Sequence, residues 1–234
     1  MGNHGVQDNN FIKTTRQTLS IELPDVTWSE RIISISDTEK WPYPDNFFDI
    51  VISNQVLEHV REHKFFFANC NRVLANGGFS VHLFPVKECF WDGHLHLPFV
   101  HWIKTYNFLG SYIRFMSRMG VGKYPSYKKK NINLCEYSAA HSDYIWYFTN
   151  YIASRNLLAI AREFGFRASW KYTSAFYGQK LRSMMRLDFI NQYSLKRGLL
   201  HDFFIARLLA RVSSITLFLE KNEIYNKFHC EREE

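Results

Sequence analysis

The sequence predicts an α/β fold in which helices cover a parallel sheet. Two apolar runs, residues 48–52 and 79–84, have the length and composition of strands that are buried on both faces. The segment between them, residues 56–74, mixes apolar and polar residues at helical spacing. A strand, a helix and a second parallel strand in this order form a right-handed crossover unit.

The elements before the first run are shorter. We expect residues 1–10 to be a frayed tail, residues 11–19 to form a helix and residues 31–36 to form a strand. A turn rich in proline, aspartate and asparagine then precedes the run at 48–52. The predicted sheet thus contains residues 31–36, 48–52 and 79–84 as parallel strands.

The elements after Pro85 begin with an irregular segment. Residues 86–148 lack clean periodicity and are dense in aromatic residues and histidine, which is typical of a lid or specificity insertion. A helix at 151–164, a strand at 167–174, a basic helical segment at 180–212 and a final strand at 214–219 should follow. We therefore expect residues 1–234 to form one domain that carries 86–148 as a lid and substrate insertion.

Composition supports a folded chain and excludes several classes of protein. The chain has 234 residues, of which 46% are hydrophobic and 17% aromatic, so one full-sized domain is expected and disorder is not. The sequence has no apolar run of 18 residues and no secretory signal. Four widely spaced cysteines predict neither a disulfide framework nor a zinc site, and they favour a cytoplasmic location.

The net charge of +7 is compatible with several partners. Much of the excess lies after residue 100, where a basic face suits nucleic acid, anionic lipid or a phosphorylated substrate. Peripheral contact with an anionic membrane is one expectation, and a solvated surface is the alternative. The sequence does not indicate an oligomeric state.

Two segments also resemble a known family. PYPDNFFDIVISNQVLEHV (residues 42–60) and RVLANGGFSVHLFP (residues 72–85) resemble the fourth-strand and fifth-strand signatures of class I S-adenosylmethionine-dependent methyltransferases, in the type-11 group. The resemblance covers roughly residues 30–86. It implies a Rossmann-like methyltransferase sheet that is incomplete at its N-terminal side, with a long insertion after the fifth family strand. It also implies S-adenosylmethionine as cofactor and two antiparallel closing strands.

One family motif is missing. The glycine-rich loop D-x-G-x-G-x-G, which lets backbone approach the cofactor closely, does not occur, because only Gly2 and Gly5 precede Gly77. The resemblance therefore leaves three interpretations open. The chain is an active methyltransferase, a catalytically inactive partner subunit or relic, or a truncated gene product whose upstream DNA would encode the missing strand and loop.

The resemblance implies a set of cofactor-binding residues, and small polar residues at a strand's carboxyl end independently favour a ligand site. An acidic residue would hold the ribose hydroxyls, a second acidic residue and its neighbour would lie by the adenine, and the end of the 48–52 strand would line the methionine. These positions are Asp8, then Asp37 and Thr38, then Ser53, Asn54 and Gln55. Caps of turns or helices are the alternative for several of them.

His59 is the candidate catalytic residue. A histidine on the first turn after the strand end is suited to take a proton from an attacking hydroxyl. Methyl transfer depends mainly on in-line placement, so a base is dispensable in the alternative interpretation.

The histidine-rich part of the insertion supplies the substrate-binding candidates His94, His96, His101 and Trp102. In an extended segment His94 and His96 point the same way, and we expect the three histidines to lie near Ser53 and His59. No carboxylate or cysteine completes a zinc set there, so no metal is expected. The pattern GH…P…HW resembles methyltransferases of sugar and polysaccharide biosynthesis, which implies a wall for sugar rings. A structural histidine loop is the alternative.

The function predicted from the sequence is therefore methyl transfer from S-adenosylmethionine to an oxygen of a small molecule or of a sugar or glycan precursor. Nucleic acid is not the expected acceptor, because the N/D-P-P-Y/F motif of base methyltransferases is absent and SNQV stands in its place.

Overall fold

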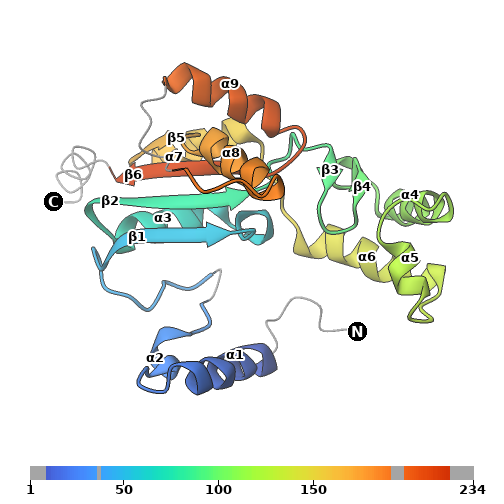
Figure 1. Cartoon of the computed structure of the whole chain (residues 1–234), viewed down its shortest axis with the longest axis horizontal. Helices are drawn as coiled ribbons and strands as arrows, with labels where there is room; N and C mark the ends of the chain where they lie inside the picture. The colour runs from blue at the N-terminus through green and yellow to red at the C-terminus, as the bar shows by residue number, and fades with distance from the viewer. Residues whose placement is uncertain (1–8, 36–37, 191–197, 222–234) are drawn as a thin grey trace. The chain divides into compact units, whose positions relative to one another are not determined.

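Figure 1 shows the computed structural model of the chain, which describes residues 9–35, 38–190 and 198–221. The chain divides into two compact units, residues 1–42 and residues 43–234. Among the described residues, no helix is long and apolar enough to cross a membrane.

The first unit contains two helices and no strand in its described part. Helix α1 (Asn9–Glu22) confirms the helix predicted at 11–19, and α2 (Trp28–Arg31) is a single turn. The strand predicted at 31–36 is wrong, because Arg31 ends α2 and residues 32–35 have no strand partner. The guanidinium of Arg16 donates to the carbonyl of Ile32, with Nε at 3.0 Å. A side chain from α1 thus occupies a backbone group that a strand neighbour would need.

The second unit is built on a four-stranded sheet in the order β1-β2-β6-β5. Its strands are β1 (Phe48–Asn54), β2 (Leu74–Phe84), β5 (Phe166–Ser169) and β6 (Ile215–Lys221). Strands β1 and β2 pair in parallel, while β6 pairs antiparallel with both β2 and β5. The parallel pairing of 48–52 with 79–84 and the antiparallel closing strands are therefore confirmed.

The segment between β1 and β2 is not one continuous helix. It contains the short 3₁₀ turn η1 (Leu57–His59) and helix α3 (His63–Val73). The side-chain amide of Asn150 donates to the carbonyls of Val60 and Arg61 at 3.0 and 2.9 Å. In a continuous helix these two carbonyls would accept backbone N–H groups one turn further on. Because they accept from Asn150 instead and Val60 is extended, the predicted helix 56–74 is interrupted here.

The glycine pair after α3 lies inside β2 instead of ending a helix. Gly77 has φ +75°, and the β1–β2 register shifts between Phe48 and Ile50 at this place. A Cβ atom on Gly78 would lie 2.8 Å from the carbonyl oxygen of Asp49. The close approach of the two strands therefore requires glycine at position 78.

The closing half matches the predicted order of elements. Helix α7 (Ser154–Glu163) is followed by Gly165, which has φ +74°. Strand β5 is shorter than predicted because α8 (Thr173–Met184) begins soon after it. Helix α9 (Leu199–Leu209) precedes β6, and residues 191–197 of the predicted helical segment lie outside the described residues. Helices α8 and α9 contact each other and β6, whereas α7 contacts β5 and α3.

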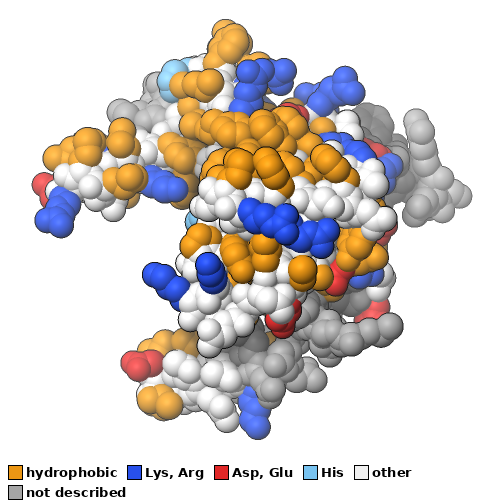
Figure 2. All heavy atoms as spheres, turned by 90° about the vertical axis from the view of Figure 1, so that its right-hand side faces the viewer, with side chains coloured by type: hydrophobic (Ala, Val, Ile, Leu, Met, Phe, Trp, Pro, Cys, Tyr) orange, Lys and Arg blue, Asp and Glu red, His pale blue; other side chains and the backbone are white. Residues whose placement is uncertain are grey.

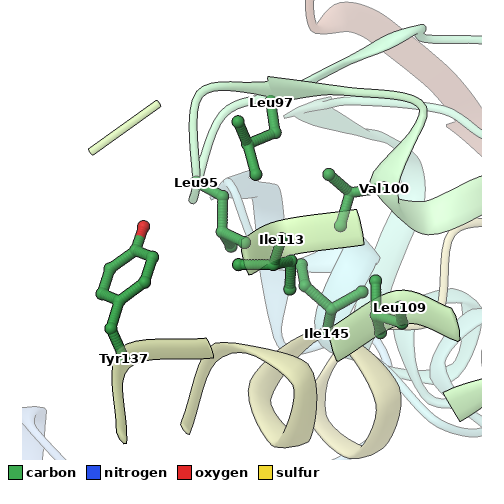
Figure 3. Close-up of a cluster of buried hydrophobic side chains, with 7 residues drawn as sticks. All are labelled: Leu95, Leu97, Val100, Leu109, Ile113, Tyr137 and Ile145. Carbon is green, nitrogen blue, oxygen red and sulfur yellow. The ribbon is translucent and has the colours of Figure 1, made fainter. Parts of the chain in front are cut away.

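The insertion at 86–148 folds around a hydrophobic core of its own. A two-stranded hairpin, β3 (Trp91–Asp92) and β4 (Leu97–Pro98), and the turn η2 (Val100–Trp102) are followed by helices α4 (Tyr106–Arg118), α5 (Tyr124–Lys128) and α6 (Leu134–Phe148). Figure 3 shows side chains from the hairpin, η2, α4 and α6 converging: Leu95, Leu97, Val100, Leu109, Ile113, Tyr137 and Ile145. Apolar burial therefore gives this segment a defined structure despite its irregular sequence.

The insertion also exposes apolar side chains. Figure 2 shows hydrophobic and basic side chains intermixed on the face that it views. Large apolar residues of the insertion that remain exposed are Trp91, Phe99, Trp102, Phe108, Phe115, Met119, Trp146 and Tyr147. Several aromatic rings are thus available to a ligand.

Candidate functional site

The carboxyl end of β1 carries Ser53, Asn54 and Gln55. The backbone N–H of Gln55, which has φ +54°, donates to the carbonyl of Leu83 at 2.7 Å. Its side-chain amide donates to Oγ of Ser214 at 2.9 Å. Gln55 thus ties the strand end to β2 and to the start of β6, while Asn54 is exposed.

Ser53 is engaged with a buried histidine of β2. Its Oγ lies 2.8 Å from Nδ1 of His82, a side chain with no exposed surface. Burial lowers the pKa of His82 to about 3, so the ring is neutral at neutral pH. Neither Ser53 nor Asn54 caps a helix, because η1 starts after Val56 and has no side-chain cap.

The side-chain carboxylate of Glu58, the middle residue of η1, is buried without a hydrogen-bond partner. Only 1% of its surface is exposed, and neither carboxylate oxygen has a partner among the described residues. Burial raises the pKa of this carboxyl from 4.5 to about 7, and the nearby charge of Asp92 acts in the same direction. Glu58 therefore changes its charge near neutral pH.

Two histidines lie beside Glu58. One ligand atom from each of Glu58, His59 and His94 lies within 4.8 Å of the other two. The rings of His59 and His94 are 5.2 Å apart between centroids. Nδ1 of His59 donates to the carbonyl of Phe148 at 2.7 Å, and Nδ1 of His94 lies 3.2 Å from the hydroxyl of Tyr144. In both rings Nε2 is the nitrogen left for other chemistry.

A buried carboxylate fixes the loop that carries His94. One oxygen of Asp92 accepts the backbone N–H groups of His94 and Leu95 at 2.9 and 2.7 Å. Its other oxygen accepts the hydroxyl of Tyr151 at 2.9 Å. Burial, together with this carboxylate, raises the pKa of Tyr151, so the hydroxyl keeps its proton. Burial also lowers the pKa of His94 although Asp92 opposes that shift, and the ring is therefore neutral at neutral pH.

The other predicted substrate residues lie at different depths. His101 is half-buried and stacks on Tyr151, with 4.2 Å between ring centroids, and burial lowers its pKa. His96 is exposed, with φ +55°, in the turn that joins β3 to β4. His94 and His96 were expected to point the same way because an extended segment was assumed. The turn makes that assumption wrong. The indole of Trp102 is 41% exposed and donates to the carbonyl of Lys87 at 2.6 Å.

Three of the predicted cofactor residues belong to the first unit. Asp8 and Asp37 lie outside the described residues, and Thr38 is exposed. The residues that the structure does bring together are His59 and His94, with Ser53 and Gln55 on the adjoining strand end.

Sequence reasoning missed the importance of four further residues. Glu58 was not a site candidate, and Asp92, Tyr144 and Tyr151 were not singled out. An acidic residue inside the histidine-rich segment was a usable signal for Asp92. No local pattern indicates Tyr144 or Tyr151, because folding alone places them beside the histidines.

A separate cavity of about 260 Å³ contains none of the predicted site residues. Residues of α7 and α9 line it together with Glu88, Trp170 and Ile215. Glu88 binds the backbone and hydroxyl of Ser154 there, at 3.0 and 2.7 Å from Oε1. The carboxylate of Glu88 is therefore paired, whereas that of Glu58 is not.

Part of the chain is similar to a known family. Residues 10–82 match the family model described as a methyltransferase domain. The match covers less than half of the chain. The order β1-β2-β6-β5 with an antiparallel β6 is the sheet arrangement that the sequence resemblance implied for the closing half of such a domain. A search of curated proteins gave no match.

Solved methyltransferase structures resemble the chain only distantly. A Mesorhizobium loti S-adenosylmethionine-dependent methyltransferase has 10% identity and a TM-score of 0.39, over 80% of this chain and 67% of that one. Streptomyces coelicolor geranyl diphosphate C-methyltransferase has 11% identity and a TM-score of 0.38, over 89% and 59%. Haemonchus contortus phosphoethanolamine N-methyltransferase 2 has 16% identity and a TM-score of 0.33, over 78% and 36%. The chain thus spans between about a third and two thirds of these proteins, and at these scores they say nothing about its substrate.

Proposed function

We propose that this methyltransferase domain transfers a methyl group from S-adenosylmethionine to a hydroxyl oxygen of a small molecule or of a sugar or glycan precursor. The observation that carries the proposal is the group formed by Glu58, His59 and His94, where the insertion meets the segment that follows β1. In α/β sheets, ligands bind beyond the carboxyl ends of the strands, and this group lies in the turn after β1.

His59 is the proposed base. Since the carbonyl of Phe148 can only accept, Nδ1 of His59 carries the hydrogen and Nε2 has the free lone pair. Nε2 takes the acceptor's hydroxyl proton as the oxygen attacks. When bound, S-adenosylmethionine supplies an electrophilic methyl group on a sulfonium. Glu58, in its ionised form, stabilises the imidazolium that forms.

The insertion supplies the proposed acceptor wall. The ring of His94 lies against that of His59, and the ring of His101 stacks on Tyr151. His96 and Trp102 are exposed. Aromatic faces stack on the apolar faces of sugar rings, and imidazoles bind hydroxyl groups. This combination favours a polyhydroxylated acceptor over an apolar one.

The β1 end fits part of a cofactor site. Exposed Asn54 and the exposed apolar residues Ile52 and Val56 suit the polar and apolar parts of the cofactor. We propose Ser53, Asn54 and Gln55 at its methionine end, whereas Asp37 and Thr38 at the adenine and Asp8 at the ribose remain expectations of the sequence resemblance. Because the sequence lacks the glycine loop, we expect weak binding, which Asp37→Ala and Asn54→Ala should weaken further.

The test is binding followed by turnover on the whole chain. Isothermal titration with S-adenosylhomocysteine should show one weak site, and labelled S-adenosylmethionine should methylate some of a panel of sugar nucleotides and phenols. A panel of amines serves as the comparison. If S-adenosylhomocysteine does not bind, or if only amines are methylated, the proposal of O-methylation is wrong.

A non-catalytic partner subunit is the second candidate. Strand β1 is an edge of the sheet in the described part of residues 43–234, and it exposes 52% of Ile50 and 76% of Ile52. Exposed apolar edges are places where another chain can pair. A stable complex with a second protein, combined with no binding of S-adenosylhomocysteine, would favour this candidate.

We also propose a cytoplasmic location with peripheral membrane contact. Cys70, Cys89 and Cys135 are free thiols, as expected in a reducing compartment. Helix α9 exposes Leu200, Phe204 and Leu208 near arginines, a combination that suits anionic lipid. Cosedimentation with vesicles containing phosphatidylserine, and its loss with Phe204→Ser, would test the contact.

A further inference from the structure

We propose that Glu58, His59 and His94 bind one divalent transition-metal ion of the zinc class. Their ligand atoms lie within 4.8 Å of one another, although the residues come from η1 and from the β3–β4 turn. A single ion can therefore lie between the three side chains after small rotamer adjustments. The site needs no other segment of the chain.

The buried carboxylate of Glu58 is the observation that points to a ligand. It is 1% exposed, its two oxygens have no hydrogen-bond partner, and no salt bridge to it occurs among the described residues. An unpaired polar group in such a place is costly, and native proteins rarely leave one. A cation between Glu58 and the two imidazoles would neutralise the negative charge of the Glu58 carboxylate and give its oxygens a partner.

The outer contacts of the histidines are those of metal ligands. A ligating histidine uses one ring nitrogen for the metal and the other to bind a carbonyl, carboxylate or similar group, which fixes the tautomer and the ring orientation. His59 does so through the carbonyl of Phe148, and His94 has the hydroxyl of Tyr144 at Nδ1. Asp92 in turn fixes the backbone of His94. The two rings are thus held in place before any ion binds.

The ligand set indicates the class of ion. Two imidazole nitrogens and one carboxylate suit Zn²⁺, Co²⁺ and Fe²⁺, whereas Mg²⁺ and Ca²⁺ prefer oxygen ligands throughout. Three protein ligands also leave a coordination position for an exchangeable molecule. Nε2 of His59 cannot bind this ion and act as a base at the same time, so the metal-bound form is distinct from the form proposed for methyl transfer.

Cobalt titration tests the site directly. Chelator-treated full-length chain, carrying Cys135→Ser and Cys230→Ser to remove two thiols, is titrated with Co²⁺ while its visible absorption is recorded. We expect ligand-field bands that saturate at one equivalent, and Zn²⁺ should displace the Co²⁺. Zn²⁺ should also raise the thermal midpoint, since an ion that binds only the folded state stabilises it.

Matched variants locate the ion. Glu58→Gln and His94→Ala should weaken binding at least about 10-fold, and Tyr144→Phe, which leaves all three ligands in place, should weaken it less. His96→Ala, in the same turn as His94 but exposed, should bind as tightly as the parent. Circular dichroism verifies that each variant is folded.

Two results would overturn the proposal. One is the absence of saturable bands in the folded parent, which would leave the three residues as a proton-sharing cluster. The other is equal binding by the parent, Glu58→Gln and His94→Ala, which would place the ion elsewhere. Because no cofactor or acceptor is present, neither result depends on whether the domain transfers methyl groups.

Discussion

The polar side chains at the end of β1 differ in their hydrogen bonding from those at the junction, by which we mean the place where Glu58, His59, Asp92 and His94 bring the segment after β1 and the insertion together. At the strand end, Ser53 binds His82 and Gln55 binds Ser214, so these groups hold strands together. At the junction, both oxygens of Glu58 lack partners, while Asp92 nearby binds three donors. The difference teaches that a polar residue at the carboxyl end of a strand does not bind a ligand merely because of its position. A buried polar group without a hydrogen-bond partner, surrounded by groups whose hydrogen bonds are complete, is the better indication of a ligand or catalytic site.

Activity should separate the two regions most strongly. If methyl transfer is observed, His59→Ala should lower kcat by about 10²–10⁴-fold, the usual contribution of a positioned base. His201→Ala on α9, 54% exposed and outside both regions, is the matched control and should change kcat little. Steady-state kinetics with the preferred acceptor measures both. Equal values for the two variants would mean that positioning, and not proton transfer, governs the reaction.

Stability should show how much the junction depends on Asp92. Asp92→Ala leaves the backbone N–H groups of His94 and Leu95 and the hydroxyl of Tyr151 without an acceptor, so we expect a loss of about 3–5 kcal/mol in the free energy of unfolding. Urea denaturation measures the loss. Asp143→Asn on α6, whose partner Tyr106 lies nearer the surface, should cost less than about 1 kcal/mol. A small effect of Asp92→Ala would show that the loop carrying His94 is not held as described.

The pH dependence of stability should have opposite signs in the two regions. Glu58 has a raised pKa in the folded state, so its neutral form stabilises the fold below pH 4.5, and this contribution is lost as the pH rises to about 7. His82 has a lowered pKa, so its contribution is complete above pH 6.5 and is lost as the pH falls toward about 3. The full span for Glu58 is about 3 kcal/mol by the usual conversion of pKa shifts.

The difference between the denaturation profiles of the parent and Glu58→Gln, recorded between pH 5 and 7 with a chelator present, isolates the Glu58 contribution, because the His82 contribution that changes below pH 6.5 is common to both. Glu58→Gln should gain stability relative to the parent as the pH rises, and His82→Asn should lose the dependence that His82 causes at lower pH. Parallel profiles for the parent and Glu58→Gln would mean that the carboxyl is better solvated than its burial indicates.

The smallest effect should come from the strand region itself. Gly78→Ala places a Cβ atom 2.8 Å from the carbonyl oxygen of Asp49, and the strands must shift to accept it. We expect a loss of about 1–3 kcal/mol, as for other overpacked sites. Gly93→Ala in the insertion, where a Cβ meets nothing within 4 Å, is the control. Thermal or urea unfolding that ranks Gly93→Ala as the more harmful change would contradict the strand geometry.

Much of the second unit could be predicted from sequence because its strands are apolar runs bounded by turn residues. Residues 48–52 and 79–84 carry that signal unambiguously, whereas residues 31–36 have the composition of a strand but no partner in the described structure. The composition of a segment does not specify which strand it will pair with. The same limit explains the missed helix break, because Asn150 lies far along the chain from the carbonyls of Val60 and Arg61 that it binds.

The junction could be predicted only in part. His59 and His94 were both candidates, but their contact depends on Asp92 and on the core of the insertion. His96 was expected to accompany His94 by strand alternation, and the positive φ of the turn separates them. Tertiary contacts of this kind leave no periodic trace in a sequence.

The two ends of the insertion meet. The N–H of Lys87 donates to the carbonyl of Ile152 at 2.9 Å, and the N–H of Asn150 donates to the carbonyl of Glu58 at 2.6 Å. A segment whose ends are adjacent and whose core is internal can be exchanged as a cassette, because the host chain needs only a short bridge across the gap. If the insertion carries the proposed acceptor wall, acceptor specificity can change in one recombination event that leaves the sheet intact. Swapping this cassette between related sequences therefore tests whether the insertion determines acceptor preference.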